Sequence, residues 1–162
     1  MKSAPRRAEV AVAGILSEKL KLIGASPVKR VPVIGRTGPD ISINEIGLVI
    51  DVKNRGEIPG GIFHNELVSF GPFLAVPLDQ IELLLAAEPI PIHFASKIVS
   101  DYWEHMHEWT AANYPNGITC LILHKSGASA VMKGKAKMPF GKSMFVIHFE
   151  SRRRLQERWL IH

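Results

Sequence analysis

Apolar positions in the first part of the 162-residue chain recur at helical spacing. Residues 4–23 place alanine, valine, isoleucine and leucine on one face, with Ser3 as a candidate N-cap and Gly24 as a stop. Lys19 falls near the middle of that face, so the amphipathic pattern is imperfect. We expect a helix here.

Beyond this helix the pattern switches between strand and helix periods. The predicted elements are strands at 28–35, 40–43, 48–53, 117–125 and 144–150 and helices at 77–88, 100–114 and 151–162. Glycine and proline are frequent in residues 56–77, which predicts a long loop, and Ser100 or Asp101 is the expected N-cap of the middle helix. Residues 126–143 are expected to form a basic loop or hairpin. No repeat or linker divides the chain, so the order predicts one α/β domain with a mixed sheet flanked by helices.

Composition is ordinary for a globular protein, with 46% hydrophobic and 22% charged residues. No apolar run approaches the roughly 18–20 residues of a membrane span. Glu18, Lys19 and Lys21 interrupt the first apolar stretch, which argues against a secretory signal. The single cysteine, Cys120, lies in an apolar strand and is expected to be a buried, inert thiol. We therefore expect a cytoplasmic protein with no membrane partner.

Charge is distributed unevenly along the chain. Residues 1–36 carry a net charge of +6, residues 37–124 carry −8, and residues 125–162 carry +7. An acidic centre between basic ends suits a protein that holds a polyanion at its edges and cations in its middle. Two solvated basic ends would give the same pattern, and charge alone does not separate the two interpretations.

The most strand-like part of the chain, residues 35–55, is predicted to be a hairpin. A turn at residues 44–47 that is symmetric about its two central residues pairs Ile43 with Leu48 and Ile41 with Ile50. Directly opposed side chains then have Cβ atoms about 4.5–5.5 Å apart.

The same register places Asp40 opposite Asp51, and the strand period of two puts Lys53 on the same face as Asp51. Two opposed carboxylates destabilise a sheet unless they share a proton or bind a cation. Mg²⁺ accepts one or two carboxylates together with water and phosphate oxygens, and a nearby lysine can position the attacking water. The hairpin therefore predicts a metal site for phosphodiester hydrolysis. If the aspartates repel each other without metal, Asp40→Asn should raise the melting temperature.

Pro39-Asp40, ten intervening residues and then Asp51-Val52-Lys53 resemble the motif of the PD-(D/E)XK nuclease superfamily. Its members include type II restriction enzymes and the archaeal-type and phage Holliday junction resolvases. The resemblance is close over the hairpin and looser over residues 4–124, where the α-β-β-β-α-β order is similar to a restriction endonuclease-like core. It implies that residues 1–162 form one nuclease domain with basic flanks.

The resemblance also implies a function: a Mg²⁺-dependent DNA endonuclease, with Mn²⁺ as a substitute, in which Asp40 and Asp51 hold the metal. Lys53 would position or polarise the attacking water. By analogy alone we expect a structure-selective resolvase or a small repair or phage nuclease that acts as a homodimer on branched DNA. A non-catalytic nucleic-acid-binding or assembly module with the same fold, and a plain domain in which Asp51 and Lys53 only form an ion pair, remain alternatives.

The family usually adds a glutamate from the first helix as a further ligand. Glu9 and Glu18 are the two candidates, on opposite edges of the apolar face, so only one of them can serve. Glu9 is slightly preferred because its "AE" context is similar to that of the resolvase helix.

Several basic residues are candidates for contacting the DNA backbone. Two border the hairpin and the others lie in the two basic segments near the end of the chain: Arg36, Arg55, Lys133, Lys135, Lys137, Lys142, Arg152, Arg153 and Arg154. Such contacts position a nucleic acid without reading its sequence. A solvated basic tail is the alternative interpretation. The pair His105 and His107 predicts no zinc site, because residues two apart on a helix do not face each other.

Overall fold

A computed structural model describes residues 12–16, 18–19, 29–30, 38–44, 46–54, 58–125 and 142–161. The described strands form one mixed eight-stranded sheet in the order β1-β2-β3-β7-β8-β5-β4-β6. The strands are β1 (Lys29–Arg30), β2 (Ile41–Ile43), β3 (Leu48–Lys53), β4 (Val68–Phe70), β5 (Phe73–Pro77), β6 (Ile90–Pro91), β7 (Ile118–Lys125) and β8 (Lys142–His148). The helices are η1 (Gly60–Ile62), η2 (Leu78–Gln80), α2 (Leu83–Ala86), α3 (Lys97–Asn113), η3 (Phe149–Ser151) and α4 (Arg152–Ile161). The expected α/β class with helices flanking a mixed sheet is confirmed.

The hairpin forms in the predicted register. Ile43 pairs with Leu48 and Ile41 pairs with Ile50 across β2 and β3. The turn closes with a 3.3 Å hydrogen bond from the Gly47 amide to the Asn44 carbonyl, and Gly47 has a φ of 67°. Glycine reaches this left-handed conformation without the steric cost that a Cβ imposes.

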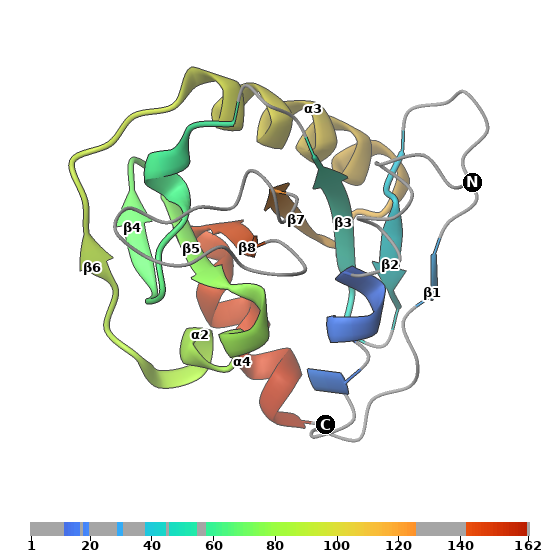
Figure 1. Cartoon of the computed structure of the whole chain (residues 1–162). Helices are drawn as coiled ribbons and strands as arrows, with labels where there is room; N and C mark the ends of the chain where they lie inside the picture. The colour runs from blue at the N-terminus through green and yellow to red at the C-terminus, as the bar shows by residue number, and fades with distance from the viewer. Residues whose placement is uncertain are drawn as a thin grey trace.

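Strands β3 and β7 pair in parallel although about seventy residues separate them in the sequence. Parallel neighbours need a crossover connection, and α3 supplies it here. Figure 1 shows α3 along the top of the molecule and α2 and α4 below, with the strands between them.

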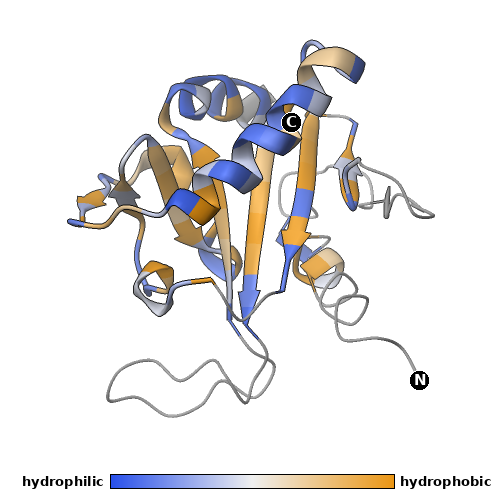
Figure 2. Cartoon of the chain, turned by 90° about the horizontal axis from the view of Figure 1, so that it is seen from above, coloured by the Kyte–Doolittle hydropathy of each residue, from blue (hydrophilic) through white to orange (hydrophobic). Residues whose placement is uncertain are grey.

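Helices on the two sides of the sheet cover two separate hydrophobic clusters. On the side of α3, named here the α3 face, Val99 packs with Leu121 and Leu123 of β7 and with neighbours from β5 and β8. On the other side, the α4 face, Leu155 of α4 joins Leu16 of the first helix in a second cluster. The strands are largely hydrophobic, whereas the helices combine hydrophilic and hydrophobic residues (Figure 2).

Three predictions about the connections were wrong. The segment 56–77, predicted as a loop, contains η1 and the β4–β5 hairpin, which joins the sheet through β8. All five residues of β5 are buried, so this strand has no alternating pattern to reveal it. The helix predicted at 77–88 is reduced to η2 and α2.

The third error concerns the start of α3. Ser96 is its N-cap, with the Ser96 hydroxyl accepting a 3.3 Å hydrogen bond from the Val99 amide. Neither Ser100 nor Asp101 is the N-cap. The helix begins about one turn earlier than predicted because Val99 is buried against the sheet. The strand predicted at 28–35 is described only over β1, and the helix predicted at 4–23 only at residues 12–16 and 18–19, where it is helical.

Candidate active site

The candidate active site is built on β3, where two polar residues point to the α3 face. Asp51 is aligned with Leu121 and Lys53 with Leu123, and both leucines belong to the cluster beneath α3. Because aligned residues of neighbouring strands point the same way, Asp51 and Lys53 lie beside an apolar cluster. Asp51 is only 7% exposed.

Lys53 is held between a carboxylate and an aromatic ring. Its Nζ lies 3.2 Å from Oδ2 of Asp51 and 5.0 Å from the centroid of the Tyr102 ring on α3. Tyr102 packs α3 against the sheet beside the lysine. The ion pair and the cation–π contact together restrict the ammonium group to one place.

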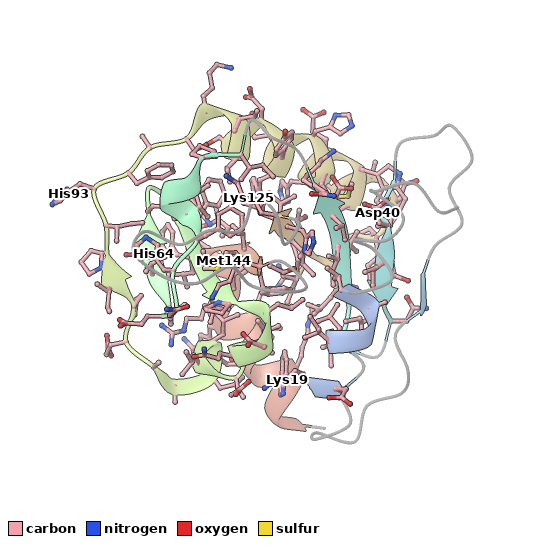
Figure 3. The ribbon with its side chains drawn as sticks, viewed as in Figure 1. Lys19, Asp40, His64, His93, Lys125 and Met144 are labelled. Atoms are coloured by element: carbon pink, nitrogen blue, oxygen red, sulfur yellow. The ribbon has the colours of Figure 1, made fainter. Side chains whose placement is uncertain are left out.

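Asp40 lies directly before β2 and is hydrogen-bonded to β3. Its backbone amide donates a 2.9 Å hydrogen bond to the Ile50 carbonyl, and its Oδ2 accepts a 2.8 Å hydrogen bond from the Val52 amide. The pairing of β2 with β3 stops at Ile41, so the predicted pairing of Asp40 with Asp51 is wrong, because the Asp40 amide bonds to the Ile50 carbonyl instead. The aspartate side chain takes the place that the next strand carbonyl would occupy. The carboxylate of Asp40 is thereby brought to the peptide bond that joins Asp51 to Val52. Figure 3 shows Asp40 beside β2 and β3.

The two carboxylates fit a hard divalent cation in donor type, since Mg²⁺ binds one or two carboxylates and completes its coordination with water and phosphate oxygens. Within the described part of the chain, no group of three or more His, Cys, Asp or Glu is placed to hold a metal ion. Any cation at Asp51 also has to share that carboxylate with Lys53, which supplies a positive charge there already.

The proposed third ligand is not brought to the pair by the described residues. Glu18 is exposed, and its helix packs through Val12 and Leu16 on the α4 face, the opposite side of the sheet from Asp51. Glu9 lies outside the described residues.

The predicted DNA contacts are divided between the two faces. Lys142 starts β8 and points to the α3 face, since Met144, two residues further on, belongs to the cluster there. Arg152, Arg153 and Arg154 lie on α4, which covers the other face. Five further candidates lie outside the described residues: Arg36, Arg55, Lys133, Lys135 and Lys137.

The arginines of α4 make contacts within the protein. Arg152 donates to the carbonyls of Leu84 and Ala87, the first at 3.0 Å, and Arg154 donates to the Asn116 carbonyl at 3.1 Å. These bonds hold α4 against α2 and the loop before β7. Arg153 pairs with Glu157 at 3.3 Å, and its side chain is 88% exposed.

Sequence reasoning missed Lys125, at the end of β7. Its Nζ lies 5.4 Å from the centroid of the Phe63 ring. The available signal was the strand period, because Lys125 follows Leu121 and Leu123 at intervals of two on the face that holds the site.

Comparison of the chain with models of protein families, with curated proteins and with solved structures found no match in any of the three. Fold and site therefore define a mixed α/β domain that carries an ion pair of a buried aspartate and a partly buried lysine on a central strand. Among the described residues, no helix is long and apolar enough to cross a membrane.

Proposed function

We propose that this protein is a metal-dependent DNA endonuclease with a restriction endonuclease-like core of the PD-(D/E)XK type. The observation that carries the proposal is the ion pair of Asp51 and Lys53 on β3, beside the Val52 amide that donates to the Asp40 carboxylate. Part of the order of elements supports it: a helix and the meander β1-β2-β3 come first, and after β4, β5 and β6 the chain continues through α3 to β7, which is parallel to β3.

Each side chain has a separate task in this mechanism. Asp51 and Asp40 provide the oxygen ligands, and Lys53, held by Tyr102, positions the attacking water or neutralises charge on the scissile phosphate. When bound, Mg²⁺ or Mn²⁺ supplies charge neutralisation at the phosphate and an acidified water. Water attacks phosphorus and gives up a proton to solvent, the bond from phosphorus to the leaving 3′ oxygen breaks, and that oxygen takes up a proton from solvent.

Two details of the proposal come from the resemblance to the superfamily. We propose branched DNA as the substrate of a structure-selective resolvase or repair nuclease, and a homodimer as the active form. A cytoplasmic location is part of the same proposal, because chromosomal or phage DNA is the implied substrate.

Cleavage of DNA by the purified protein tests the proposal. Branched, duplex and single-stranded DNA are incubated with and without Mg²⁺ or Mn²⁺, beside Asp51→Asn and Lys53→Ala. Each variant is expected to lose at least about a hundredfold in rate, the usual cost of removing a group that stabilises developing charge. The pair Lys97 and Asp101 on α3 is a matched control, because its 2.9 Å ion pair is exposed. Asp101→Asn and Lys97→Ala should cleave normally, and equal activity of all four variants would reject the proposed site.

Metal binding is measured separately by thermal unfolding. Mg²⁺ at a hundred times its dissociation constant adds about 2.7 kcal/mol to the free energy of unfolding. We expect this gain in the parent protein and in Asp101→Asn, and its loss in Asp51→Asn. A gain that persists in Asp51→Asn would place the metal elsewhere.

A nucleic-acid-binding module without turnover is the second candidate. The ion pair favours this module, because Lys53 already neutralises the charge of Asp51 in the absence of metal. The lack of a third acidic ligand among the described residues also favours it. Binding of DNA without cleavage in either metal would support this module and exclude the enzyme.

A further inference from the structure

Four aromatic rings follow one another on the α3 face, from α3 to the end of β8. The Trp103 ring stacks on His107 with centroids 4.4 Å apart and lies 5.1 Å from the ring of His148. His148 in turn stacks on Phe149 at 5.0 Å. Phe149 is 54% exposed, more than any other large hydrophobic residue among those described, and His107 is also exposed. These four rings, named here the aromatic ladder, therefore present an aromatic surface to solvent at each end.

Hydrogen bonds hold the Phe149 end of the aromatic ladder in place. The Phe149 amide donates a 2.8 Å hydrogen bond to the Pro72 carbonyl, and Nδ1 of His148 accepts a 3.2 Å hydrogen bond from the Glu150 amide. An Nδ1 that accepts a hydrogen bond carries no proton, so the His148 ring is uncharged in this arrangement. Because these groups are already fixed, little conformational entropy is lost when another group stacks on the ladder.

Carboxylates border the aromatic ladder at both ends. Glu104 lies three residues before His107 on α3, and such neighbours have Cβ atoms about 5–6 Å apart. Oε2 of Glu150 lies 4.0 Å from Nδ1 of His148, and the Glu150 side chain is 75% exposed. Within the described part of the chain, no lysine or arginine pairs with either glutamate, and the one lysine of α3 pairs with Asp101 instead. The ladder therefore combines exposed rings with uncompensated negative charge.

An arginine side chain matches this combination. Its guanidinium group is planar and positive, so it stacks on the face of an aromatic ring and donates hydrogen bonds to carboxylates. A nucleobase would also stack, but the carboxylates would repel the phosphates attached to it. The exposed end at Phe149 is open, whereas sites for small molecules enclose most of their ligand. The surface therefore favours an arginine carried by a protein over a nucleic acid or a free small molecule.

An apolar hollow beside the aromatic ladder offers the partner a second contact. Phe73 contacts the rings of Trp103 and His148 and also lines the hollow, together with Phe70 and Phe94. The hollow has a volume of about 320 Å³, at the lower end of the range for ligand pockets. It can therefore accept an apolar side chain from the same segment that carries the arginine.

We infer that the aromatic ladder and the adjoining hollow bind a basic segment of a protein partner. An arginine of the segment stacks on Phe149 beside Glu150, and an apolar residue of the segment enters the hollow. Arginine is specified over lysine because only the guanidinium group is planar. This interaction surface goes beyond the proposed nuclease function and requires neither metal nor DNA.

Titration of the isotope-labelled protein with a short peptide, followed by NMR, tests the inference. The blocked peptide Gly-Arg-Gly-Leu-Gly is compared with versions in which citrulline or lysine replaces arginine. The readout is the indole N–H signal of Trp103, whose buried Nε1 has no hydrogen-bond partner among the described residues, so the signal reports changes in the neighbouring rings. We expect the arginine peptide to shift this signal, the lysine peptide to bind more weakly, and the neutral citrulline peptide to bind least.

Variants at the exposed end of the aromatic ladder separate stacking from charge. Phe149→Leu keeps an apolar side chain and should weaken the peptide about two- to fivefold, the contribution of an exposed cation–π contact, whereas Phe149→Tyr should keep the affinity. Glu104→Gln/Glu150→Gln should weaken it by a similar factor, and the exposed control Glu88→Gln should not.

Three results would overturn the inference, whether or not DNA cleavage is found. The first is a Trp103 signal that does not move with the arginine peptide. The second is parental affinity in Phe149→Leu or equal binding of the citrulline peptide. The third is a shift with a single-stranded thymidine oligonucleotide that exceeds the shift with the peptide and is lost in Phe149→Leu, which would assign the aromatic ladder to nucleic acid.

Discussion

Replacing Asp40 separates its proposed role as a metal ligand from its observed role in the sheet. In the structure its carboxylate accepts a 2.8 Å hydrogen bond from the Val52 amide. Asp40→Ala leaves that amide without its acceptor at a partly buried position. Hydrogen bonds to charged groups contribute about 1.5–3 kcal/mol, so we expect a loss of about 2 kcal/mol in the free energy of unfolding.

A loss of this size lowers the melting temperature of a domain of this length by about 4–8 °C. Asp40→Asn keeps an acceptor oxygen for the Val52 amide and should lose less than half as much. The structure thus predicts a lower melting temperature for Asp40→Asn, whereas the sequence, through repulsion between Asp40 and Asp51, predicted a higher one. The ion pair of Asp51 with Lys53 weakens that repulsion, and the hydrogen bond opposes it.

Urea unfolding at constant m-value gives the free energies, and hydrogen exchange at the Val52 amide reports the bond directly. Glu88→Ala, which removes an exposed carboxylate, is the control for the loss of negative charge. If Asp40→Ala is as stable as Glu88→Ala and exchange at the Val52 amide is unchanged, the Asp40 hydrogen bond does not stabilise the sheet. A higher melting temperature in Asp40→Asn would show that repulsion dominates.

Two further predictions concern stability. Burial lowers the pKa of His124 below its ordinary value, so the folded protein binds fewer protons than the unfolded chain below about pH 6.5. The free energy of unfolding should therefore be level above that pH and fall below it by at most about 1.4 kcal/mol per pH unit. In urea unfolding, His124→Gln should reduce this fall, whereas the exposed control His105→Gln should not. An unchanged fall in His124→Gln would show that His124 does not cause it. A Cβ on Gly47, where φ is 67°, would lie 2.5 Å from Nη1 of Arg158, whereas Gly71, with a φ of 51°, has nothing within 4 Å. Both alanine variants carry the cost of the left-handed conformation, about 1–2 kcal/mol. Gly47→Ala should melt at a lower temperature than Gly71→Ala, because only its Cβ contacts Arg158. Equal melting temperatures would show that the Arg158 side chain moves aside without cost.

The sequence alone determined the local parts of this protein. Alternation and turn residues are read from neighbouring positions, so they predicted the β2–β3 hairpin, its register and the shared face of Asp51 and Lys53. Apolar runs likewise predicted β7 and the burial of Cys120, whose thiol pKa burial raises.

Tertiary contacts decided the rest. The parallel pairing of β3 with β7, the opposition of Lys125 and Lys142, and the hydrogen bond from the Val52 amide to Asp40 all join atoms from different elements. The periodicity of the sequence does not predict these contacts, because they depend on how separate elements pack. For the same reason the sequence could not show that α4 and the first helix share the face opposite the site. Packing of distant elements placed the Asp51–Lys53 pair and the Lys125–Lys142 pair on one face of the sheet.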